Sequence, residues 1–167
     1  MTQEIAEYTG FSFPSLLEKY NLDISSYTDR QKIEIMEWAL LDNFDNIAQD
    51  LPVDHFIHDG MYYRALTIPS GVCLTGKIHH DDHICILEQG DLSVMTDDGM
   101  KRLTAPARFK ARAGLKKIGY AHSEVIFSTV HRTTAKTCEE AEEKHFSDSD
   151  LAWVKELVGD RLCQSQE

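Results

Sequence analysis

Histidine is the residue type in this sequence with the clearest chemical potential. The chain has 8 histidines in 167 residues, and the segment Lys77-Ile78-His79-His80-Asp81-Asp82-His83 gathers a group of them between two runs that read as strands. Side chains alternate faces along a strand, so Lys77 and His79 are expected to point the same way. His83 begins the next strand and is expected to meet His79. Two imidazoles that converge from adjacent strands can bind a divalent metal or transfer a proton.

The other histidines and the acidic residues near this pair are expected either to form a polar turn or to act as additional metal ligands. His80, Asp81 and Asp82 are expected to form only a solvated turn. His131 ends a later strand and can complete a three-histidine site, a ligand set that suits zinc or another first-row metal. His55, from the first strand, is a further candidate.

Short strands must position these side chains. Runs rich in β-branched and aromatic residues alternate with turn residues, and no helix is predicted between them. Such a pattern indicates an antiparallel sandwich or barrel. The predicted strands cover residues 61–68, 72–78, 83–87, 92–96, 107–111 and 125–130.

Helices are predicted on both sides of the strands. Thr28-Asp29-Arg30-Gln31 has the form of a capping box and precedes an apolar stripe, and an earlier short helix is predicted over 14–20. After the strands, 138–145 reads as a solvated acidic run, and 147–150 offers a cap for a last helix. The predicted units are a helical extension over 1–53, a β-barrel over 54–134 and an acidic helical segment over 135–167.

The acidic composition narrows the class of partner. A formal net charge of −11 argues against nucleic acid, because binding a phosphate backbone requires clustered lysine and arginine. It also argues against an anionic membrane surface. The first ten residues lack the basic start and apolar run of a signal peptide, and no apolar stretch approaches the ~20 residues that span a bilayer. The sequence therefore predicts a cytoplasmic protein without a nucleic-acid or membrane partner.

The segment that ends at Gly90 resembles the first motif of the cupin superfamily. That motif runs Gly, five residues, His-x-His, three or four residues, Glu, six residues, Gly. With Gly90 as the closing glycine, His83 takes the Glu position, His79 the second His position and Lys77 the first. Gly71 stands two residues further from the histidines than the motif has it.

The second cupin motif, Pro-x-Gly-x-x-His with a following Asn, is matched in part. Gly114 is retained, Arg112 replaces the Pro, Lys117 stands where the metal-binding His would be, and Ala121 replaces the Asn. More closely, the chain resembles short uncharacterised cupin-like proteins of bacteriophage and bacteria. That likeness implies no biochemical activity.

The resemblance implies a mainly β fold: one cupin-like antiparallel barrel, or jelly roll, with N-terminal helices and a C-terminal helix. A complete cupin site offers three His and one Glu to iron, manganese, nickel or zinc. Among the matched positions only His79 and His83 are good ligands here, because a protonated lysine cannot coordinate a metal. A metal site in this chain would therefore combine His79, His83 and His131.

The lysines favour a second interpretation, in which the pocket is basic. If the strand face that carries Arg64 points inward, Arg64 joins Lys77, Lys117 and the histidine pair. So much positive charge inside a barrel is costly unless an anion enters. The predicted catalytic residues are His79 and His83, and the predicted substrate-binding residues are Arg64, Lys77, Lys117 and Tyr120.

The predicted function is binding of a small anionic metabolite in the barrel. The sequence leaves open whether the protein is a metal-dependent enzyme, a non-catalytic binding module or a scaffold, because a fold alone does not choose among these roles. A homodimer is expected, since Trp38, Leu40 and Leu41 place more apolar surface on one helix than a lone helix buries.

Overall fold

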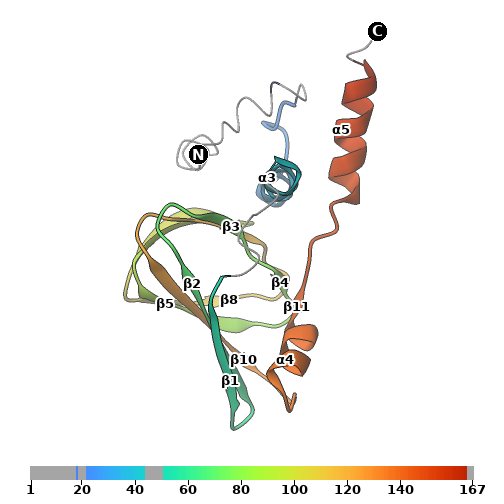
Figure 1. Cartoon of the computed structure of the whole chain (residues 1–167). Helices are drawn as coiled ribbons and strands as arrows, with labels where there is room; N and C mark the ends of the chain where they lie inside the picture. Colours follow the sequence, from blue (N-terminus) through green and yellow to red (C-terminus); the bar gives the residue numbers. More distant parts are fainter. Residues whose placement is uncertain (1–17, 19–21, 44–50, 165–167) are drawn as a thin grey trace.

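Two antiparallel sheets face each other in the computed structural model, which describes residues 18, 22–43 and 51–164 (Figure 1). The neighbouring strands of the first sheet are β1 (Val53–His58), β2 (Met61–Ile68), β10 (Val125–Arg132), β5 (His83–Gln89) and β8 (Ala107–Ala111). Those of the second sheet are β3 (Cys73–Thr75), β9 (Lys117–Ala121), β6 (Asp91–Thr96) and β7 (Gly99–Thr104). A short pair joins β4 (Ile78–His79) to β11 (Phe146–Ser147).

Strands from both halves of the chain interleave in each sheet, and this order is that of a jelly roll. The mainly β jelly-roll prediction is therefore confirmed. The two large sheets stay separate, however, so the strands do not form a closed barrel.

Each predicted strand run contains a strand, and the run over 72–78 divides into β3 and β4. The strands β1, β7, β9 and β11 lie outside the predicted runs. β7 has few apolar residues and lies at a sheet edge, where it pairs with β6 across a short turn. β7 is a strand because it pairs with β6, and not because its own sequence alternates apolar and polar residues.

The helix α3 (Asp29–Asn43) begins at the predicted capping box. The backbone N–H of Thr28 donates to Oε1 of Gln31 at 3.0 Å, and the backbone N–H of Gln31 donates to Oγ1 of Thr28 at 3.3 Å. The earlier helix predicted over 14–20 lies outside the described residues, except for Glu18.

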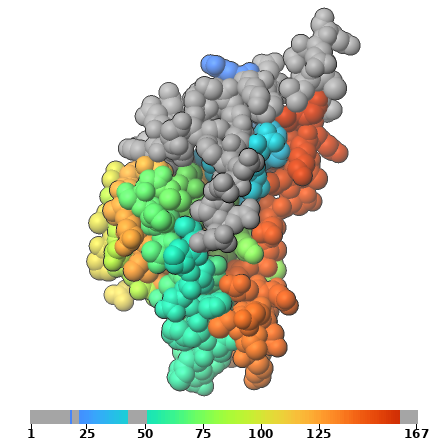
Figure 2. All heavy atoms as spheres, in the orientation of Figure 1, coloured from blue at the N-terminus to red at the C-terminus, as the bar shows by residue number. Residues whose placement is uncertain are grey.

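Two further helices follow the sheets. The helix α3 packs on the outer face of the four-stranded sheet, where it shares a buried core with Met95 and Ile118, and the helix α5 (Ala152–Gln164) packs against α3 (Figure 1). The helix α4 (Cys138–His145) lies beside the hairpin of β1 and β2 at the other end of the molecule (Figure 2). No helix in the described part of the chain is long and apolar enough to cross a membrane.

Gly90, which closes the motif around the histidines, makes the sharp turn from β5 to β6. Its φ of +91° lies in the left-handed region, which favours glycine. A Cβ at this position would come 2.2 Å from the carbonyl oxygen of Glu124. The turn therefore requires glycine, and it places β5 and β6 in opposite sheets.

Candidate functional site: a basic cavity beside a histidine cluster

A cavity of about 710 Å³ lies between the two sheets. Strands β2 and β10 supply one wall, and β3, β6 and β9 supply the other. Most of the lining is apolar. The apolar side chains on the walls are Leu66, Ile68, Leu74, Leu92, Val94 and Phe127.

One end of the cavity is polar. Arg64 on β2 pairs with Thr129 on β10, and Thr129 pairs with Cys85 on β5. The Nζ atom of Lys117 on β9 lies 3.8 Å from Sγ of Cys85, which brings it to the same end. His79 also lines the cavity. A ligand here would meet cationic and imidazole groups at one end and apolar side chains along the two sheet walls, while Glu37 and Asp148 also line the cavity outside those walls.

The structure brings most of the predicted pocket residues to this cavity. Arg64, Lys77 and Lys117 line it. Arg64 is already engaged, because its Nε donates to Oε1 of Glu142 at 3.0 Å. Lys77 is largely exposed and lies 3.9 Å from a carboxylate oxygen of Asp148. Lys117 and Gly119 face the cavity, whereas Tyr120 on the same strand is not among the lining residues.

Lys117 has an unusual environment for a lysine. Its side chain is buried, and its Nζ contacts Nε2 of His83 at 3.3 Å and Sγ of Cys85 at 3.8 Å. Burial lowers the pKa of this ammonium below its ordinary value. Among the described residues, no carboxylate bonds to it.

The three histidines predicted to hold a metal lie together. His79 Nδ1 is 3.2 Å from His131 Nε2, and the ring of His83 stacks on both, at centroid distances of 4.1 Å from His79 and 4.6 Å from His131. Each offers one ligand atom within 4.8 Å of the others. His55 is placed elsewhere, with its Nδ1 2.9 Å from the hydroxyl of Tyr62.

Burial keeps these imidazoles neutral. It lowers the pKa of His83 to about 4 and that of His131 to about 3. It lowers the pKa of His79 further still, and the charge of Lys117 adds to that effect. Neutral imidazole is the form that coordinates metals.

The positions matched to the cupin ligands do not by themselves form a metal site. Lys77 is directed towards Asp148 at the surface. Lys117 contacts the Nε2 atom of His83, while Nδ1 of His83 lies 2.9 Å from the carbonyl oxygen of Asp81. The carbonyl can only accept, so Nδ1 carries the proton and Nε2 uses its lone pair on the ammonium. A metal on His83 would have to displace Lys117.

A second group of ligand atoms, not predicted from the sequence, adjoins the first. Asp81, His131 and His145 each offer one atom, and these atoms also lie within 4.8 Å of one another. The turn formed by His80, Asp81 and Asp82 is exposed, as predicted. His145, expected in a solvated acidic run, is instead buried. The turn also contacts the end of α4, where Nδ1 of His80 lies 2.9 Å from the carbonyl oxygen of Lys144.

The pairing of β4 with β11 explains this arrangement. His79 on β4 lies opposite Phe146 on β11, and the backbone N–H of His80 donates to the carbonyl oxygen of His145 at 2.9 Å. These contacts join residues that are 67 and 65 positions apart. No spacing within the sequence signals it.

Comparison with protein-family models and with curated proteins finds no match. Solved structures with some similarity include a cupin superfamily protein from Desulfitobacterium hafniense, 10% identical over 56% of this chain and 87% of that chain, with a TM-score of 0.44. A second is an RmlC-like cupin family protein from Methanocaldococcus jannaschii, 12% identical over 55% and 87%, with a TM-score of 0.43. A third is KdgF from Halomonas sp., 14% identical over 55% and 90%, with a TM-score of 0.44.

At these identities and TM-scores, no ligand, metal or activity transfers to this chain. The closer resemblance to bacteriophage proteins stays a prediction. The protein is a jelly roll with an internal cavity that is apolar along its sheet walls and basic at one end.

Proposed function

We propose that the cavity binds a small molecule with an apolar body and one anionic group, and that the anionic group contacts Lys117. The observation that supports this most strongly is the buried ammonium of Lys117, which no carboxylate of the described residues neutralises. A buried, unpaired charge is costly. An anionic ligand would pair with the buried ammonium and remove this cost. Binding of an anion is therefore more favourable than it would be at an exposed lysine.

The cavity suits such a molecule in size and polarity. Ligand pockets commonly measure about 300–1,000 Å³ and are mostly apolar with a few polar groups, and this cavity of about 710 Å³ falls in that range. A carboxylate at Lys117 would leave a hydrocarbon or aromatic body among Leu66, Leu92 and Phe127. His79 lies at the polar end as a neutral imidazole.

Calorimetric titration with straight-chain carboxylates from acetate to octanoate, and with phosphate, tests the proposal. We expect affinity to rise with chain length, because each buried CH₂ contributes about 0.8 kcal/mol. The variant Lys117→Met should weaken binding by at least about ten-fold, since it removes a charge-assisted hydrogen bond. Lys110→Met is the matched control, because Lys110 is exposed on β8 outside the cavity. No binding of any of these anions, or equal affinity in Lys117→Met, would contradict the proposal.

The stability of the ligand-free variant gives an independent readout. If Lys117 serves binding, Lys117→Met should raise the free energy of unfolding by about 1–4 kcal/mol, because it replaces a buried unpaired charge with a hydrophobic side chain. A loss of stability would instead assign Lys117 a purely structural role.

A metal-dependent enzyme is the second candidate, and the observation that favours it is the proximity of His79, His83 and His131. These residues would hold the ion through neutral imidazoles, and the metal would supply Lewis-acid chemistry beside the cavity. The contact between Lys117 and His83 opposes this candidate. The metal-dependent candidate predicts one zinc, iron, manganese or nickel ion per chain in protein purified without chelator. It also predicts that His83→Gln loses this ion, which metal analysis measures.

A further inference from the structure

Two buried nitrogen atoms next to the cavity have no hydrogen-bond partner among the described residues. They are Nδ1 of His131 and Nε2 of His145. His131 exposes 1% of its surface and His145 exposes 0%, and their ring centroids lie 5.0 Å apart. Buried polar atoms in proteins are nearly always bonded, so a pair of unbonded nitrogens in adjacent rings calls for an explanation.

The surrounding contacts define which nitrogens carry a lone pair. Nδ1 of His145 lies 2.5 Å from Oδ2 of Asp81. A carboxylate accepts, so Nδ1 of His145 carries the proton and Nε2 keeps its lone pair. The strong hydrogen bond from His145 also holds the pKa of the Asp81 carboxyl below its ordinary value, so Asp81 stays ionised. A carboxylate that orients a histidine in this way is typical of metal-ligating histidines.

His131 fits the same pattern. Its Nε2 lies 3.2 Å from Nδ1 of His79. With the proton of His131 on Nε2, that contact becomes a hydrogen bond to the lone pair of His79, and the unbonded Nδ1 of His131 carries a free lone pair. His131 and His145 then present two unused lone pairs, whereas His79 and His83 use theirs on His131 and Lys117.

We propose that Asp81, His131 and His145 form a binding site for a divalent first-row metal ion such as zinc. The two unpartnered imidazole nitrogens would coordinate the ion. Asp81 would orient His145 and supply the negative charge that compensates the cation. Imidazole nitrogen is a ligand that zinc and its neighbours accept, and water would fill the remaining coordination positions.

Electrostatics favours this group over the three predicted histidines. The ammonium of Lys117 touches His83, a member of the first group only, and it would repel a cation placed there. The second group contains a carboxylate instead. Asp81 has a side chain that is 50% exposed, which gives an ion a route from solvent. The proposal is independent of anion binding in the cavity.

Titration of chelator-treated full-length protein with zinc alone, followed by calorimetry and metal analysis, tests this site. We expect one zinc ion per chain, and a loss of affinity of at least about a hundred-fold in His145→Gln. Asp81→Asn should cost about ten- to a hundred-fold, the range typical of groups that orient a ligand. His83→Gln and the exposed-site control His58→Gln should bind zinc as the original protein does.

The opposite pattern would overturn the proposal. If His83→Gln loses zinc and His145→Gln keeps it, the ion belongs to the three predicted histidines. Absence of zinc binding in the original protein, or equal losses in His83→Gln and His145→Gln, would also overturn it. If His145→Gln does not fold, Asp81→Asn tests the site instead, because the half-exposed side chain of Asp81 tolerates the change. Unchanged zinc affinity in Asp81→Asn would contradict the proposed site. Carboxylate titrations of the same variants show separately whether the cavity proposal holds.

Discussion

Two buried imidazoles make the metal-free protein sensitive to acid. Burial lowers the pKa of His83 to about 4 and that of His131 to about 3, whereas an unfolded histidine titrates near ~6.5. Between these values the unfolded chain binds more protons than the folded one. The folded state therefore keeps its full stability above about pH 6.5 and loses it as the pH falls towards the folded pKa values.

We predict that the free energy of unfolding falls by on the order of 2 kcal/mol per buried histidine between about pH 7.5 and pH 5. Urea denaturation in the presence of a chelator measures this dependence. His83→Gln should show a shallower slope than the original protein, and the exposed-site control His58→Gln should show the same slope. A slope unchanged by His83→Gln would mean that His83 is not held neutral by the fold.

Single residues also show where sequence reasoning ends. His79, His83 and His131 could be grouped in advance because strand alternation and spacing decide which side chains share a face. Asp81 and His145 could not, because their contact depends on how β4 and β11 pair across the chain. A polar turn next to an acidic helix reads as solvated surface until the helix is known to pack on the turn.

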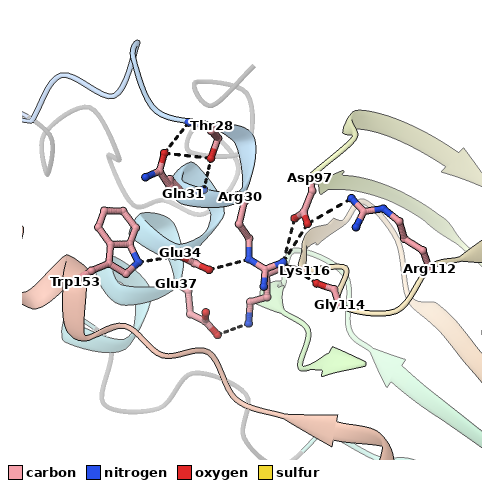
Figure 3. A network of polar contacts seen from close by, with 10 residues as sticks. All are labelled: Thr28, Arg30, Gln31, Glu34, Glu37, Asp97, Arg112, Gly114, Lys116 and Trp153. Atoms are coloured by element: carbon pink, nitrogen blue, oxygen red, sulfur yellow. Dashed lines mark hydrogen bonds and ion pairs between the residues drawn. The ribbon is translucent and has the colours of Figure 1, made fainter. Parts of the chain in front are cut away.

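At the scale of elements, α3 is fastened to the four-stranded sheet by polar contacts (Figure 3). Arg30 donates to Oδ2 of Asp97 at 3.1 Å and to the carbonyl oxygen of Gly114 at 2.8 Å. Lys116 donates to Oε1 of Glu37 at 2.6 Å. The start of α3 is predictable because the capping box is local. Its docking is not, since Arg30 reaches partners 67 and 84 residues away.

The ion pair between Glu37 and Lys116 is the most buried contact of this group. The side chain of Lys116 is 1% exposed and that of Glu37 is 12% exposed. We predict that Lys116→Met lowers the free energy of unfolding by about 3–5 kcal/mol, because it leaves the carboxylate buried without its cation. The double variant Glu37→Leu/Lys116→Met should recover most of that loss. Urea denaturation of the singles and the double measures the coupling, and a double variant no more stable than Lys116→Met would contradict the prediction.

At the scale of the whole molecule, most of the exposed large apolar side chains in the described part of the chain lie on strands rather than on a helix. The homodimer expectation rested on Trp38, Leu40 and Leu41. In the structure Leu40 is buried and Trp38 packs against the same core, so that only Leu41 is strongly exposed. The outer face of the five-stranded sheet instead exposes three large side chains, namely Phe56, Met61 and Ile84.

This face suits a second copy of the chain because its charge is self-complementary. Asp54 is exposed at one edge, on β1, while Arg108 and Lys110 are exposed at the other, on β8. If two copies pack face to face about a two-fold axis that runs along the strands, β1 of one lies over β8 of the other. Apolar side chains then meet at the centre, and opposite charges meet at both edges.

We therefore predict a dimer in solution that Ile84→Lys converts to a monomer, because the variant places two charges at the centre of an apolar contact. Light scattering after gel filtration measures the mass. Leu41→Lys is the matched control: Leu41 is 52% exposed and Ile84 is 49% exposed, so both changes should be tolerated by the fold. Loss of the dimer in Leu41→Lys alone would move the interface to α3, and a monomeric original protein would exclude both surfaces. Raised salt should weaken the dimer as well, since the charged edges lie at its solvent-exposed rim.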